Sequence, residues 1–221
     1  MAQTEVQPPI EQIVKDILQT IEKEREREIV SRRYGLFDRK ETLEQIGELL
    51  GITRERVRQL EKAIIARLKN QAEQGNLPHV FEIQSVITTF LSKHGYLARS
   101  SVLAEKLTKD GNKLDQARIA FLATMAPNLV VVDENDYYFQ GVASVDQYKD
   151  PKTTTKQVDI VVKAIKELGQ PSSIKVVTDA VKESDSAKIE SLASISKLLA
   201  SLNGEWGLTK WPTVNPKNIR D

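Results

Sequence analysis

The sequence predicts a mainly α protein, with a helix-turn-helix domain followed by two winged-helix-like domains that carry short β-hairpins. Apolar residues recur at i, i+3 and i+4, the spacing of one buried helix face, along most of the 221 residues. Glycines follow several of these segments, where helices commonly end. Short apolar runs beside turn residues, near positions 130 and 205, are typical of hairpin strands instead.

The first predicted domain, residues 1–72, is helical throughout. Ile10 to Ile21 carries an apolar stripe with helical spacing, and a charged stretch follows it. Gly35 is expected to end the next helix, and Thr42 is expected to cap a helix over 43–50. Gly51 then forms a turn, and Thr53 caps a helix that reaches Leu68.

The second predicted domain, residues 76–146, has three helices and a hairpin. The expected elements are a helix from Phe81 to near Gly95, helices over 102–107 and 113–125, then strands over 129–132 and 137–139. Asp133, Glu134 and Asp136 are interpreted as turn residues rather than metal ligands. The third helix is expected to expose Lys113, Gln116 and Arg118. Because the domain is net negative, we expect a protein partner or a spacer.

The third predicted domain, residues 154–221, repeats this order of elements. We expect helices over 158–168, 174–181 and 189–202, a wing strand from Gly204, and Trp206 and Trp211 packed on the wing. At an offset of 74 residues the apolar positions of the two domains align, either by duplication or because such units resemble one another. Exposed lysines could add weak phosphate contacts, namely Lys175, Lys182, Lys188 and Lys197.

Composition excludes several classes of protein. The chain has no cysteine, which removes disulfides, thiolate zinc sites and cysteine nucleophiles. Its only histidines, His79 and His94, stand at predicted helix ends, and no glycine-rich phosphate loop is present. We therefore expect no enzyme, no metal site and no cofactor. No signal peptide or membrane span is predicted, so we expect a cytoplasmic protein.

Positive charge is concentrated on one helix although the whole chain is only +1. Residues 53–70 carry six basic and two acidic side chains, whereas residues 1–52 carry eight and eleven. In a helix-turn-helix, the N-terminal residues of the second helix reach base edges in the major groove. Arginine pairs with guanine, glutamine with adenine, and glutamate accepts from cytosine. The candidates at the start of this helix are Arg54, Glu55, Arg56, Arg58 and Gln59; the alternative is a solvated helix face.

Residues 24–69, and above all TRERVRQLE, resemble region four of bacterial sigma-70 factors, which binds the promoter −35 element. The resemblance implies base contacts at Arg54, Glu55, Arg58 and Gln59. It also implies DNA-backbone contacts at the matching positions Arg25, Arg33, Thr42 and Arg56. Lys62 stands where the family usually has alanine, so its role is open; as a cation on the same helix it is counted with the backbone contacts.

The resemblance implies a sequence-specific, DNA-binding transcription regulator associated with the bacterial nucleoid. It would recognise a −35-like element in double-stranded DNA through the helix Arg54–Lys69. No aromatic-rich segment for opening a −10 element is present, so promoter melting is not expected. The alternative is an accessory protein that docks on RNA polymerase. The stripe at Ile10–Ile21 would then be a polymerase groove or a homodimer contact, rather than packing on the helix-turn-helix.

The rest of the chain resembles a group in which region four is fused to winged-helix repeats. Those proteins often continue into a further winged-helix module, of the type found in the polymerase delta subunit. The final residues, from Trp206 onward, are similar to the lead-in to that module. Our hypothesis is that the natural protein continues beyond Asp221.

Overall fold

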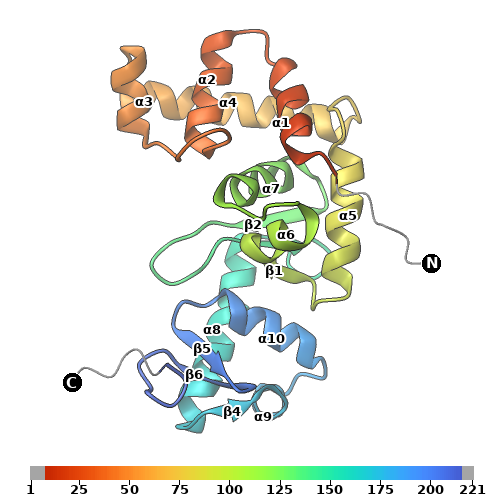
Figure 1. The fold of residues 1–221 in the computed structure, drawn as a ribbon, viewed down its shortest axis with the longest axis vertical. Helices are drawn as coiled ribbons and strands as arrows, with labels where there is room; N and C mark the ends of the chain where they lie inside the picture. Colours follow the sequence, from red (N-terminus) through yellow and green to blue (C-terminus); the bar gives the residue numbers. More distant parts are fainter. Residues whose placement is uncertain (1–7, 216–221) are drawn as a thin grey trace. The chain divides into compact units, whose positions relative to one another are not determined.

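The computed structural model describes residues 8–215 and is drawn in Figure 1. Over these residues the chain forms ten helices and six strands, which confirms the mainly α class with short hairpins. They fall into two compact units, Met1–Val86 with Ser100–Pro127, and Ile87–Arg99 with Asn128–Asp221. The three-domain division remains a prediction. The hypothesis about Asp221 concerns a residue outside the described range.

The first unit is entirely helical over its described residues. Its elements are α1 (Ile10–Gln19), α2 (Glu24–Tyr34), α3 (Leu43–Leu50), α4 (Arg54–Glu73), α6 (Ser100–Leu107) and α7 (Lys113–Met125). Helix α5 (Val80–Ser92) begins in this unit and ends in the other. None of the helices within residues 8–215 is long and apolar enough to cross a bilayer.

The predicted helix boundaries around α3 and α4 are confirmed. The Thr42 hydroxyl accepts from the Gln45 amide at 3.2 Å, and the Gln45 side chain accepts from the Thr42 amide at 2.9 Å, so the two form a capping box. Gly51 ends α3 in the left-handed region, at φ 64°. Thr53 then caps α4 by accepting from the Arg56 amide at 3.2 Å.

The apolar stripe of α1 is buried inside the first unit. Ile13, Val14 and Ile17 are at most 3% exposed, and α1 packs mainly on α7. The same helix α7 also contacts α2 and α4, where Tyr34 meets Phe121 edge to face at 5.2 Å. Packing is therefore the outcome for the stripe, but its principal partner is α7 rather than the helix-turn-helix. No polymerase groove is open along this buried face of α1.

The expectation that Arg118 is exposed on α7 is wrong, because its side chain is 7% exposed. Its Nε donates to the Leu36 carbonyl oxygen at 2.9 Å. Its Nη1 lies 3.3 Å from Asp115 and 3.1 Å from Glu11. The charge is tolerated because carboxylates and a carbonyl oxygen replace the lost water. Arg118 thus connects α7, the α2–α3 loop and the start of α1.

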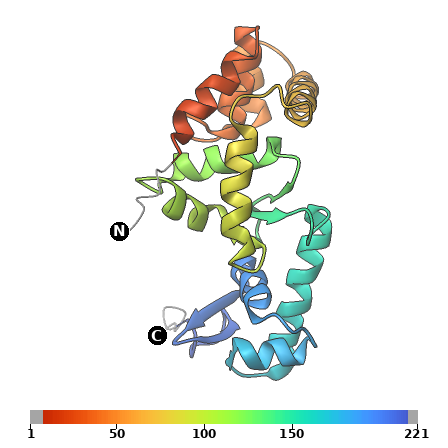
Figure 2. The ribbon, with the colours of Figure 1, turned by 90° about the vertical axis from the view of Figure 1, so that its right-hand side faces the viewer.

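The second unit contains two antiparallel three-stranded sheets, and its helix α8 packs on α10 and β6 (Figure 2). The sheets have the strand orders β1-β3-β2 and β4-β6-β5. The elements are β1 (Leu97–Arg99), β2 (Leu129–Val132), β3 (Gly141–Ser144), α8 (Pro151–Leu168), β4 (Ser172–Ser173), α9 (Ile174–Ala180), α10 (Ser186–Ile195), β5 (Leu199–Leu202) and β6 (Glu205–Leu208).

The second strand of the first hairpin was predicted at the wrong place. Residues 137–139 do not pair with β2; the partner is β3, with Val132 opposite Gly141. Tyr138 instead forms an isolated antiparallel bridge with Ser196, and the Phe139 amide donates to the Ile195 carbonyl at 2.8 Å. The segment 133–140 is drawn out of the hairpin because these backbone groups pair with the end of α10.

The last predicted helix is also too long. Helix α10 ends at Ile195, and Leu199 and Leu202 belong to β5. Between β5 and β6, Asn203 and Gly204 have φ values of 51° and 80°. Two consecutive positive φ angles at an Asn-Gly pair are typical of the tight turn that joins hairpin strands. Because of this turn, Leu199 and Leu202 form a hairpin strand although their spacing also fits a helix face.

The element order α-β-α-α-β-β occurs twice, from α5 to β3 and from α8 to β6. In both cases the strand that comes last in sequence lies at the centre of its sheet. Shared element order and shared strand order are consistent with duplication, but the alternative of chance similarity stays open. The assignment of both segments as winged-helix domains stays a prediction.

Candidate nucleic-acid interface

The helix-turn-helix is assembled by a small apolar core. Ile29 of α2, Ile46 of α3 and Val57 of α4 are fully buried against one another, with Leu50 and Ile52 packed beside them. The Ile52 amide donates to the Gly47 carbonyl oxygen at 2.9 Å, which closes the turn between the two helices. This core fixes which face of α4 is left in water.

We expect Gly47→Ala to lower the free energy of unfolding of the first unit by about 1–3 kcal/mol. A Cβ at this position would lie 2.7 Å from the Ile52 carbonyl oxygen, so backbone would have to move. The measurement is a urea titration followed by far-ultraviolet circular dichroism. Glu48→Ala, at the exposed next residue, is the control and should change little. An unchanged unfolding midpoint for the glycine variant would contradict the close packing.

All four predicted base contacts lie on the exposed side of the first two turns of α4. Arg54, Glu55, Arg58 and Gln59 are exposed, whereas Val57, on the opposite side, is fully buried. The positions i, i+1, i+4 and i+5 form one helix face. The structure therefore brings these side chains together as a single polar surface.

Within this surface the side chains bind one another. Arg58 donates to both carboxylate oxygens of Glu55, at 2.8 Å and 2.7 Å, and Gln59 donates to the same carboxylate at 3.3 Å. Arg54 lies 2.9 Å from Glu44 of α3. The bonds from Arg58 lower the pKa of Glu55, and the carboxylate raises the pKa of Arg58. All are well exposed, so water and salt weaken these pairs, and a ligand can replace them.

The predicted backbone contacts divide into two kinds. Arg56 and Lys62 are exposed on α4. The other three also hold the domain together. Arg25 donates to the Leu50 carbonyl at 2.7 Å, and Thr42 caps α3. Arg33 is 29% exposed and lies 3.2 Å from Glu61. Contacts of all five residues with DNA stay predictions.

A further cation, Lys23, stands beside two of these residues and was not among the predicted contacts. Together with Arg25, Arg56 and Leu60 it lines a hollow of about 190 Å³ next to the start of α4. The charged stretch after α1 is the sequence feature that could have identified Lys23. Acidic and basic residues alternate in it, so the sequence alone does not show which side chain faces α4. The hollow brings three cations and the carboxylate of Glu26 near one another, and lysine and arginine are residues that contact phosphates in protein–DNA complexes.

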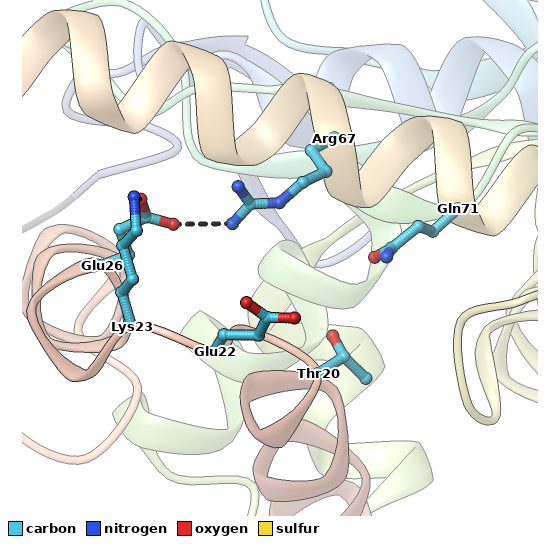
Figure 3. Close-up of a pocket in the computed structure, with 6 residues that line it drawn as sticks. All are labelled: Thr20, Glu22, Lys23, Glu26, Arg67 and Gln71. Carbon is cyan, nitrogen blue, oxygen red and sulfur yellow. Dashed lines mark hydrogen bonds and ion pairs between the residues drawn. The ribbon is translucent and has the colours of Figure 1, made fainter.

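A second hollow, of about 210 Å³, lies between α4 and the segment that joins α1 to α2 (Figure 3). Arg67 reaches from α4 to Glu26 of α2, where Nη2 and Oε2 are 2.7 Å apart. This hydrogen bond lowers the pKa of Glu26, and Lys23 lies 3.5 Å from the same carboxylate. Cations and carboxylates offset one another here, and the Arg67–Glu26 pair connects α4 to α2.

The histidines lie at helix ends, as predicted. His79 precedes α5 and lies 3.4 Å from Asp16 and 3.3 Å from Glu82. His94 follows α5 and stacks on Phe90 at 4.0 Å. In the predicted turn, the Asn135 side chain accepts from the amides of residues 137 and 138, and Glu134 pairs with Lys197 at 2.7 Å.

Comparison with known families gives a match for residues 23–70, to Sigma-70, region 4. Region 4 is a DNA-binding helix-turn-helix that recognises the −35 element. The match agrees with the resemblance found in residues 24–69 and covers less than a quarter of the chain.

The curated relatives are sigma factors that match over the same part of the chain. RNA polymerase sigma factor sigB of Arabidopsis thaliana is 40% identical over 62 residues, which is 28% of this chain and 11% of that protein. RNA polymerase sigma factor SigA of a Bacillus species is 37% identical over 70 residues, covering 31% and 18%. RNA polymerase sigma factor SigA1 of Synechococcus elongatus is 49% identical over 47 residues, covering 21% and 12%. The chain thus spans less than a fifth of each relative. No solved structure matches it.

Proposed function

We propose that this protein is a sequence-specific, DNA-binding transcription regulator that recognises a −35-like promoter element through α4. The observation that carries the proposal is the coincidence of two features in residues 23–70. These residues match Sigma-70, region 4, and the helix-turn-helix leaves the matching polar residues of α4 exposed on one face. The proposal includes no catalytic step and no cofactor.

In the proposed complex the first turns of α4 enter the major groove. Arg54 and Arg58 donate to guanine O6 and N7, Gln59 pairs with adenine, and Glu55 accepts from cytosine. Each pairing requires the side chain to leave its present partner on the protein surface. Arg25, Arg33, Thr42, Arg56 and Lys62 are proposed to contact phosphates, which sets the register of α4 on the duplex.

Selection from randomised duplex DNA at two salt concentrations tests the proposal with the full chain. We expect enrichment of a motif similar to TTGACA, retained at the higher salt concentration. Binding without enrichment, lost steeply as salt rises, would mean that the arginines contact only phosphates and would overturn base reading. Absence of binding at both salt concentrations would overturn DNA recognition altogether.

A second candidate function is docking on RNA polymerase, favoured because the relatives that match residues 23–70 are polymerase sigma factors. Its test is retention of the full chain on immobilised core polymerase in the absence of DNA. Specific retention, abolished by competition with a sigma factor, would support docking. DNA selection with no retention would reject it. Homodimerisation and the lack of promoter melting remain further proposals of the same kind.

A further inference from the structure

Helix α8 of the second unit carries a row of four exposed lysines. These are Lys152, Lys156, Lys163 and Lys166, here called the α8 lysine row. At 100° per residue they fall within an arc of about 80°, and at 1.5 Å per residue they extend over about 21 Å. The buried residues of α8, among them Val158, Val161 and Ile165, lie on the opposite side. The row therefore faces water along nearly the whole helix.

Positive charge in the row exceeds the negative charge beside it. Four lysines stand against three carboxylates, since Asp150 precedes Lys152 and Asp159 lies within the same arc and keeps its negative charge while it accepts from the Tyr138 hydroxyl at 2.6 Å. Glu167 lies 3.8 Å from Lys163, but both side chains are at least 67% exposed, so the pair is weak. Within residues 8–215, no ion pair within 4 Å involves the other three lysines of the row.

The rest of the second unit offers less to an anion. Helix α10 follows α9 as the second helix of a helix-turn-helix does, yet its surface is already covered. Ser191 donates to the His94 carbonyl, and the Ser194 carbonyl accepts from Arg99. Of the lysines predicted to contact phosphates, Lys188 lies 3.0 Å from Glu183 and Lys197 lies 2.7 Å from Glu134. Lys175 and Lys182 are exposed, so within residues 8–215 that set leaves two lysines without an ion pair, whereas the α8 lysine row leaves three.

We infer that the α8 lysine row binds the phosphate backbone of duplex DNA without reading its sequence. Protein interfaces are depleted in lysine, whereas four exposed lysines line this face of α8. Lysine ammonium groups are mobile point charges that suit phosphates at no fixed angle. A duplex of 21 Å carries about twelve phosphate charges. The inference goes beyond the proposed function, because α8 lies outside residues 23–70.

The experiment compares two quadruple variants of the full chain that lose the same charge. The first replaces the row, with K152Q, K156Q, K163Q and K166Q. The control replaces four exposed lysines elsewhere, with K93Q, K106Q, K109Q and K113Q. Affinity for a random-sequence duplex is measured by fluorescence anisotropy between about 50 and 200 mM salt. Each lost phosphate contact should reduce the magnitude of the slope of log K against log salt by about 0.9. For the row variant we therefore expect this magnitude to fall by about 2 to 4.

An unchanged slope in the row variant would overturn the inference, and so would an equal reduction in the control variant, which would reflect net charge alone. If the row variant loses affinity for polyglutamate while its duplex binding is intact, the row serves an acidic protein partner, and the duplex assignment is wrong. Binding of the Arg58→Ala variant to the selected DNA site tests the proposed function separately from the α8 lysine row. If Arg58→Ala removes the sequence preference but leaves the salt dependence of binding unchanged, α4 reads the bases and the α8 lysine row contacts the phosphates.

Discussion

Arg118→Ala is expected to lower the free energy of unfolding of the first unit by about 3 kcal/mol. Removing one partner of a buried ion pair typically costs about 3–5 kcal/mol, because the other partner stays buried without its counter-ion. Here Asp115 loses its cation and the Leu36 carbonyl loses its donor. The Thr108 hydroxyl, which lies 2.8 Å from the Ala104 carbonyl oxygen and 2.9 Å from Asp115, stays as a donor beside the carboxylate, so we expect a cost at the lower end of this range.

Chemical unfolding followed by far-ultraviolet circular dichroism measures this change. Trp206 and Trp211 belong to the second unit, so their fluorescence reports on that unit separately. Lys113→Ala, at an exposed position of α7, is the matched control and should stay within about 0.5 kcal/mol of the parent. Arg118→Met keeps most of the side-chain stem, so it separates lost charge from lost packing. A loss under about 1 kcal/mol for Arg118→Ala would contradict the buried pair.

Arg58→Ala is expected to weaken binding to the selected DNA site by about 1–3 kcal/mol, roughly 5- to 150-fold, and to relax the preference at one base pair. Arginine supplies two parallel donors, and alanine supplies none. In the protein these donors already bind Glu55 in the same two-point manner, at 2.8 Å and 2.7 Å. Guanine O6 and N7 are also two acceptors in one plane, so the guanidinium of Arg58 can bind guanine with the two donors that now bind Glu55.

Titration of the selected duplex and of duplexes with single substitutions measures both effects. Lys106→Ala, an exposed cation on α6, is the control and should leave base preference intact. Equal weakening on every duplex would show that Arg58 contacts only phosphate. Glu55→Gln is a useful companion, because it removes the carboxylate that holds Arg58 while keeping the shape of the side chain.

Local signals predicted the helix-turn-helix well, because its boundaries depend on neighbours in sequence. Thr42, Gly51 and Thr53 each act within a few residues, and the face of α4 follows from its helical period. Arg118 was misplaced because a charged residue is normally exposed, and its partners, Leu36 and Glu11, are far away in sequence. Helix α7 is also buried on most sides, so no one-sided apolar pattern marked its inner face.

The strand errors have a different origin. Leu199 and Leu202 fit both a helix face and a strand, and the following Asn-Gly pair decides between the two. Residues 137–139 alternate as a strand does, but their backbone pairs with the end of α10. For the candidate site, the roles of Arg25 and Arg33 in holding the domain depend on Leu50, Glu41 and Glu61, which no spacing rule identifies.

The packing of α7 on α1, α2 and α4 makes the compact unit around the helix-turn-helix larger than its family match. A chain ending near residue 72 would keep every residue of the match, but it would uncover Ile13, Ile17 and Tyr34, which α7 and its neighbours now shelter. Each large apolar side chain returned to water costs about 1.5–3 kcal/mol. A chain cut at that boundary would keep the helix-turn-helix but lose the helix α7 that packs on α1, α2 and α4. The matched segment alone is therefore expected to be less stable than the same segment within the full chain.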